Sequence, residues 1–117
     1  MGDCKQLLVW KQAHGLALEI YRATRLFPSD ERYGLVAQMR RAAVSIVSNI
    51  AEGSGRQSDR EQSRFLRIAR GSVHEVQCQL LLSRDLGFLA SDKWLMLDGS
   101  VQEISKMING LAGSLNS

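Results

Sequence analysis

Residues 91–115 read SDKWLMLDGSVQEISKMINGLAGSL, and this stretch decides the fold class. Its large apolar residues recur at alternating steps of three and four, which places them on one face of an α-helix. They are Trp94, Leu97, Val101, Ile104, Ile108, Leu111 and Leu115. An unbroken alternation of this kind is the a/d seam of a helix bundle or coiled coil. Ser91 or Asp92 can cap its start, so a helix is predicted over about residues 92–115.

A second long helix is predicted over about residues 59–86. Ser58 and Glu61 have the spacing of a capping box at its start, and Gly87 follows its last turn. Its apolar residues again recur at helical spacing, which predicts one buried face. The expected inward residues are Phe65, Ile68 or Ala69, Val73, Val76 and Leu80.

Two more helices are predicted nearer the N-terminus, over about residues 5–26 and 31–52. Phe27-Pro28 ends the first, because the residue before a proline is pushed out of the α region. Ser29 or Asp30 can cap the second. The expected inward residues are Trp10, Ala13, Ala17, Ile20 and Thr24 in the first helix, widened by Leu7, Leu16 and Tyr21, and Val36, Met39, Ala43, Ile46 and Ile50 in the second.

The length of 117 residues allows one domain with a single core, which we assign to residues 1–117. Hydrophobic residues make up 44% of the chain and the only proline lies between predicted helices, so a helical core is feasible. Short connections between long helices make sequential neighbours antiparallel. The prediction is therefore an all-α, antiparallel up-down-up-down four-helix bundle.

Composition argues against several other classes. Two cysteines, Cys4 and Cys78, are too few for a disulfide framework. The start of the chain lacks the basic and apolar regions of a secretory signal. No uninterrupted apolar run approaches the roughly 18 residues of a membrane span. We therefore expect no membrane association and a reducing, cytoplasmic location.

Small and hydrogen-bonding residues form a further stripe beside the apolar line of the second helix, and similar residues lie on the third. An interior amide or carboxylate needs hydrogen-bond partners to offset its desolvation. We therefore predict a partly buried polar seam between these helices, although the spacing fits solvated residues equally well. The members of the polar seam are Ser45, Asn49, Glu52, Ser72 and Glu75.

Positive charge is concentrated in residues 40–70. The chain carries 15 Lys and Arg against 12 Asp and Glu, a net charge of +3. Residues 40–70 hold seven arginines and three carboxylates, a net +4, so the remaining residues sum to −1. Because arginine binds phosphate through a forked set of donors, this surface is predicted to bind the backbone of RNA or DNA. The candidate residues are Arg40, Arg41, Arg56, Arg60, Arg64 and Arg67.

Other interpretations of these arginines stay open. They can form a solvated helix face, with Glu61 paired to Arg60 or Arg64. They can also contact acidic surfaces of a protein partner or of neighbouring subunits, which would make the protein an interaction scaffold. Phe65 is the only aromatic residue near them, so base stacking is not expected. A symmetric oligomer would repeat the arginines and so multiply the phosphate contacts.

Neither a metal site nor a catalytic site is predicted. His74 and Cys78 lie four residues apart on one helix, but two ligands do not make a metal site. Gly53-Ser54-Gly55 breaks the second helix, and a glycine there can take the left-handed conformation. Arg56 follows, but the lysine and spacing of a phosphate loop are missing, so we expect a turn. Neither histidine has a Ser or Asp motif around it, so we expect no enzyme and no cofactor.

Several separated stretches resemble one protein family. The most specific is residues 39–53, MRRAAVSIVSNIAEG. Supporting pieces are Trp10 with Ala13, Tyr21 with Thr24, Phe27-Pro28, Tyr33-Gly34-Leu35 and residues 65–72, FLRIARGS. Over about residues 7–115 the chain resembles the bacterial four-helix bundle family first known from proteins encoded in intervening sequences of large-subunit ribosomal RNA genes. Residues 75–79, EVQCQ, depart from the usual ELETQ of the family, which leaves any role of the second carboxylate in doubt.

The resemblance implies a ring-like homopentamer of antiparallel bundles. It also implies a relation to the accessory proteins of diversity-generating retroelements, which are basic pentamers that bind nucleic acid and a reverse transcriptase. Carried onto this chain, nucleic-acid binding would fall to the arginines named above. The polar seam would then hold helices or neighbouring subunits in register.

Overall fold

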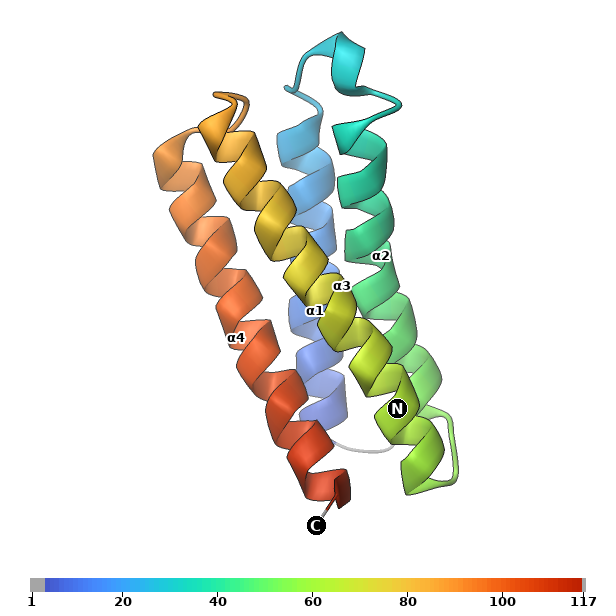
Figure 1. Cartoon of the computed structure of the whole chain (residues 1–117). Coiled ribbons are helices and arrows are strands. Elements are labelled where there is room, and N and C mark those ends of the chain that lie inside the picture. Colours follow the sequence, from blue (N-terminus) through green and yellow to red (C-terminus); the bar gives the residue numbers. More distant parts are fainter. Residues whose placement is uncertain (1–3, 117) are drawn as a thin grey trace.

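The computed structural model describes residues 4–116, and within them the side chains of residues 6–115. Its helices are α1 (Cys4–Thr24), the short 3-10 helix η1 (Ser29–Glu31), α2 (Leu35–Ser54), α3 (Asp59–Asp85) and α4 (Ser91–Asn116) (Figure 1). Residues 4–116 contain no β-strand, which confirms the all-α prediction.

Each long helix packs against two neighbours, so the four helices close into a ring. Among the described residues, α1 and α3 each contact α2 and α4, whereas the diagonal pairs make no backbone contact. The helices run alternately up and down a body that measures 44 × 25 × 18 Å. The start of α3 and the end of α4 therefore lie at one end of the bundle, and the α1–α2 connection lies at the other (Figure 1). This arrangement confirms the up-down-up-down topology.

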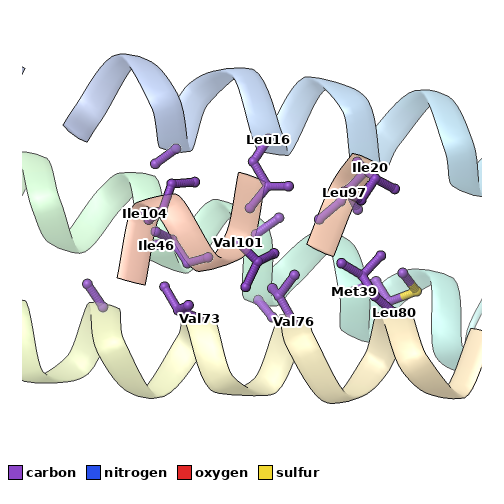
Figure 2. Packing of buried hydrophobic residues seen from close by; sticks show 14 of the residues in the cluster. Leu16, Ile20, Met39, Ile46, Val73, Val76, Leu80, Leu97, Val101 and Ile104 are labelled. Atoms are coloured by element: carbon purple, nitrogen blue, oxygen red, sulfur yellow. The ribbon is translucent and has the colours of Figure 1, made fainter. Parts of the chain in front are cut away.

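The core is a column of aliphatic side chains contributed by all four helices, among them Leu16, Ile46, Val73 and Ile104 (Figure 2). Fully burying one such side chain stabilises the fold by roughly 1.5–3 kcal/mol. The predicted lines on two helices are confirmed. Buried residues are Val36, Met39, Ala43, Ile46 and Ile50 on α2, and Leu97, Val101, Ile104, Ile108 and Leu111 on α4. Trp94 and Leu115 are half-buried at the ends of the α4 seam.

On α1 the predicted face is rotated from the observed one. The buried residues are Val9, Ala13, Leu16, Ile20 and Thr24. Trp10 and Ala17, which were expected at the centre, are half-buried at the border, and Leu7 and Tyr21 are exposed. Apolar residues occupy more than half of the helix circumference here, so periodicity alone does not fix its phase.

On α3 the expected face is also partly wrong. Leu66 is buried and Phe65 only half-buried, and of the two alternatives Ala69 is buried whereas Ile68 is 41% exposed. A small residue at position 69 suits a place where neighbouring helices come close. Val73, Val76 and Leu80 are buried as predicted.

The α1–α2 connection differs from the prediction because Ser29 and Asp30 do not cap α2. Both lie in η1, and the α-helix begins only at Leu35, so the expected start near residue 31 is wrong. Instead, the Leu35 N–H donates a hydrogen bond to Glu31 Oε2 at 3.3 Å. One carboxylate four residues upstream thus satisfies one of the free N–H groups at the start of α2.

The ends of α3 agree with the sequence. Ser58 Oγ accepts a hydrogen bond from the Glu61 N–H at 3.1 Å, which confirms the N-cap. Gly87 has φ 81°, its N–H donates to Arg84 O at 3.0 Å, and the Phe88 N–H donates to Ser83 O at 2.9 Å. These two bonds form a Schellman motif, which requires a left-handed residue and so favours glycine.

The end of α2 does not follow the prediction of a left-handed glycine. Gly55 has φ −88°, and Gly53 lies inside the helix. Gly53 is buried, and a Cβ placed on it would come 3.2 Å from the Cβ of Phe65. Gly53 therefore serves close approach between α2 and α3.

Candidate nucleic-acid interface

The basic surface is carried by the N-terminal half of α3. The side chains of Arg60 and Arg67 are exposed, and neither guanidinium makes a hydrogen bond or ion pair within the described part of the chain. Arg64 Nη1 lies 3.7 Å from Glu61 Oε2, and its guanidinium lies 5.3 Å from the centre of the Phe65 ring. Of the three, Arg60 and Arg67 therefore keep the most charge free for a ligand.

A hollow of about 460 Å³ lies beside these arginines, between α3 and the last turns of α4. Arg60, Arg67 and Arg70 line its α3 side, and Leu115 belongs to its α4 side. Among the described residues that line it, Asp59 is the one carboxylate, so this lining carries a net positive charge.

Arg70 was not among the predicted binding residues. Its Nη1 donates to Asn109 Oδ1 at 3.3 Å, which holds the side chain across the α3–α4 boundary. Residues 60, 63, 67 and 70 follow the alternating spacing of one helix face, and Ser63 also lines the hollow. Helical spacing, which predicted the apolar faces, therefore also predicts that Arg70 lies on the same face of α3 as Arg60 and Arg67.

Arg40 lies at the other end of the bundle from the α3 arginines. Its Nε donates to Thr24 Oγ1 at 3.0 Å and its Nη2 to Tyr21 O at 3.2 Å. The guanidinium lies 4.6 Å from the centre of the Tyr21 ring. Arg40 thus binds the C-terminal end of α1, where exposed carbonyls favour a cation. The expectation that it joins the other candidates is wrong, because α2 and α3 are antiparallel and both stretches lie near the starts of their helices.

Arg41 and Arg56 are paired with carboxylates. Arg41 Nη2 lies 2.6 Å from Glu75 Oε2 and also donates to Gln38 Oε1. Arg56 Nη2 lies 3.1 Å from Glu52 Oε2. Arg41 bridges α2 and α3 in the upper half of the bundle, apart from the hollow, whereas Arg56 lies near the start of α3.

The polar seam exists as a smaller network than predicted. Ser45 Oγ and Ser72 Oγ lie 2.8 Å apart, which joins α2 to α3. Asn49 Nδ2 donates to Ser45 O at 2.8 Å and to Ser45 Oγ at 3.1 Å. Glu75 lies one turn further along α3 in the pair with Arg41, whereas Glu52 is exposed and bonds Arg56 instead. Glu52 therefore does not belong to the network.

A separate ion pair joins α1 to α4. Lys93 Nζ donates to Glu19 Oε2 at 2.9 Å, and Arg22 Nη1 donates to Glu19 Oε1 at 2.8 Å. The hydrogen bond from Lys93, followed by that from Arg22, lowers the pKa of Glu19 below its ordinary value. Glu19 and Arg22 lie on α1, the helix diagonal to α3, and Lys93 lies in the first turn of α4, so this group has a structural role apart from the arginine surface.

His74 and Cys78 are both exposed on α3. Across the residues that the structure describes, no three His, Cys, Asp or Glu side chains are grouped as metal ligands would be. No helix within the same residues is long and apolar enough to cross a membrane.

Comparison with known proteins places this fold in a family. The model of one family, described as "23S rRNA-intervening sequence protein", matches residues 5–110. The chain belongs to this family. The match covers most of the chain and confirms the resemblance found in the sequence.

One solved structure shows that the fold is shared. It is described as a protein with unknown function from the S23 ribosomal protein family of Bacteroides thetaiotaomicron VPI-5482. The two chains are 21% identical with a TM-score of 0.85, over 93% of this chain and 98% of that one. At this identity the similarity supports the fold and not a shared activity. The search of curated proteins gave no match.

Proposed function

We propose that this intervening-sequence family member is a non-enzymatic, cytoplasmic, oligomeric protein that binds the phosphate backbone of RNA or DNA through the arginines of α3. The observation that carries the proposal is the pair Arg60 and Arg67. Both side chains are exposed and have no carboxylate partner among the described residues, and they lie beside a hollow that Arg70 also lines. Guanidinium groups arranged in this way suit phosphate oxygens, which accept forked hydrogen bonds.

The contacts of the other candidate arginines limit the proposed interface to the surface around Arg60 and Arg67. Arg64 lies at its edge, and Arg56 lies nearby but is paired with Glu52. Arg40 and Arg41 are removed from it, because Arg40 lies at the opposite end of the bundle and Arg41 is paired with Glu75. Such an interface reads backbone rather than bases, since the hollow presents no pair of exposed aromatic rings.

Oligomerisation belongs to the proposal because few cations act per chain. Each phosphate contact adds to the affinity, and a homopentamer of the kind the family resemblance implies repeats the arginine surface in each subunit. Leu18, Tyr21 and Val44 line an apolar hollow of about 290 Å³ between α1 and α2, which offers a surface for a neighbouring subunit.

The second candidate function is an interaction scaffold whose arginines contact acidic protein surfaces, such as those of a reverse transcriptase. The same free charges on Arg60 and Arg67 support it. Salt titration separates the two, because a backbone binder loses affinity steeply with salt for any nucleic-acid sequence.

The test is fluorescence anisotropy with labelled mixed-sequence RNA and single-stranded DNA, repeated over a series of salt concentrations. Each phosphate-bound arginine contributes about 0.7–0.9 to the slope of log K against log salt. Arg67→Gln is expected to weaken binding and reduce that slope by about one such contribution per contacting subunit. Lys11→Gln is the matched control, since Lys11 is exposed on α1, diagonal to α3. No binding of wild-type protein at low salt, or equal effects of the two substitutions, contradicts the proposal.

A further inference from the structure

A second basic hollow, of about 280 Å³, lies at the opposite end of the bundle from the α3 arginines. It lies at the α1–η1–α2 connection, where Pro28 separates the end of α1 from η1. Figure 1 shows this connection at the end of the bundle opposite the start of α3. Arg25, Arg32 and Arg40 all line it, although they come from different segments of the chain. The connection brings three guanidinium-bearing residues to one small space.

The charge of Arg40 is held at the wall of this hollow. The side chain is half-buried, its two hydrogen bonds to Thr24 Oγ1 and Tyr21 O fix its position, and the Tyr21 ring packs against it. Nη1 takes no part in these hydrogen bonds. Arg40 therefore supplies a fixed cation whose conformational freedom is already restricted before any ligand binds.

Arg25 and Arg32 have no such structural task. Both side chains are exposed, and within the described part of the chain neither guanidinium makes a hydrogen bond or an ion pair. The hydrogen bonds at the end of α1 go to other groups, since Ala23 O and Thr24 O accept the N–H groups of Leu26 and Phe27, and Tyr21 O accepts from Arg40.

None of the described residues that line the hollow carries a carboxylate. Asp30 and Glu31 belong to η1 but lie outside the lining, and Glu31 Oε2 is committed to the Leu35 N–H. The hydroxyl of Ser29 lines the hollow and adds a neutral donor. The lining residues therefore contribute three cations, and an anion placed among them is attracted by all three.

We propose that this hollow binds a phosphate group through Arg25, Arg32 and Arg40, with Ser29 as a further donor. A tetrahedral oxyanion suits the forked donors of several guanidinium groups. The volume lies just below the range of about 300–1,000 Å³ typical of pockets for larger organic ligands, so a small phosphate fits better than a whole nucleotide. The site is independent of the α3 surface and does not rest on the proposed nucleic-acid function.

The phosphate can come from free inorganic phosphate or from the backbone of a nucleic acid, and one experiment distinguishes these sources. Inorganic phosphate is titrated into ¹⁵N-labelled protein at constant ionic strength, and the backbone amide signals are followed by NMR. We expect saturable shifts at Arg25, Ser29 and Arg32. The double variant Arg25→Gln, Arg32→Gln should bind phosphate at least about tenfold more weakly, since each lost charge-assisted hydrogen bond accounts for roughly that factor.

The matched control is Arg60→Gln, Arg67→Gln, which removes the same charge at the other end of the bundle. This control variant should still bind inorganic phosphate in the hollow lined by Arg25, Arg32 and Arg40. A short single-stranded DNA titrated into the same proteins identifies the source. If DNA shifts the Ser29 signal in wild type and the Arg25→Gln, Arg32→Gln variant loses that shift, the site binds backbone phosphate. If that variant weakens the binding of inorganic phosphate and leaves the response to DNA unchanged, the site binds the free ion.

Two results overturn the inference. One is shifts at Ser29 that rise linearly without saturation, and the other is equal weakening of phosphate binding by the two double variants. Both pairs of arginines are exposed, so the variants should melt at the wild-type temperature in phosphate-free buffer. Failure of the α3 variant to change DNA binding would count against the proposed function alone.

Discussion

Replacing Gly53 by alanine should destabilise the bundle, although alanine is the better helix former. Gly53 lies inside α2 and is buried against α3. A Cβ there would come 3.2 Å from Phe65 Cβ and 3.5 Å from Gln62 O, and the first distance is shorter than ordinary van der Waals contact. Gly71 is the matched control, because it lies in the middle of α3 and a Cβ there would have no neighbour within 4 Å.

The two substitutions share the same gain in helix propensity, up to about 1 kcal/mol, which is smaller for Gly53 because it lies near the end of α2. Only Gly53→Ala adds a crowded contact, and overpacking of this kind costs roughly 1–3 kcal/mol. We therefore expect Gly71→Ala to raise the free energy of unfolding by about 1 kcal/mol and Gly53→Ala to lower it by about as much. For a chain of this size that separates the two melting temperatures by roughly 6–10 °C.

The assay is urea unfolding followed by circular dichroism, at one protein concentration because association shifts apparent stability. The m-value should stay constant, so that the midpoint reports stability. Equal stabilisation by both alanines would refute the reasoning, since it would mean that α2 and α3 separate freely at Gly53. Loss of stability in Gly71→Ala would indicate that the surface of α3 around Gly71 packs against another molecule.

Three further predictions concern contacts between helices. Ser45→Ala and Ser72→Ala should each cost about 1 kcal/mol, and the double variant should cost less than their sum, which a double-mutant cycle in urea measures. Because the pKa of Glu19 is lowered in the folded protein, its pairing with Lys93 stabilises the fold above the ordinary glutamate pKa of about 4.5, and this contribution is lost as the pH falls through the lower folded-state pKa. Melting temperatures of wild type and Glu19→Gln should therefore converge in acid, and a constant difference down to the lowest pH would contradict this. Arg40→Lys should lower the melting temperature by a few degrees, since lysine lacks the planar fork whose Nε and Nη2 donate separately to Thr24 Oγ1 and Tyr21 O, and an unchanged melting temperature would argue against that role.

Periodicity was sufficient for the fold because α4 carries an unbroken seam, and most residues between its seam positions are polar or glycine. It failed for the phase of α1, where Val9 and Trp10, and again Leu16 and Ala17, are adjacent apolar residues. Only packing against α2 and α4 decides which member of each pair is buried. The start of α2 differs from the prediction because Ser29 has the residue type of an N-cap but begins η1. The first N–H of α2, that of Leu35, is instead bound by the Glu31 carboxylate.

Part of the arrangement of the arginines can be predicted from the sequence. The separation of Arg40 from Arg60 follows from the antiparallel topology alone. Arg70 also follows from helical spacing with Arg67. The hollow around Arg25 and Arg32 does not follow, because the path of a short irregular connection after Pro28 determines which of its side chains converge.

The closed ring of helices has a consequence for how the chain folds. Three of its four helix–helix interfaces join helices that are consecutive in the chain, and such contacts close short loops and form quickly. The interface between α1 and α4 joins distant parts of the chain and is the smallest of the four. It should therefore form last and open first. Amide hydrogen exchange should accordingly be fastest along α1, with α2 and α3 as the slowest-exchanging unit.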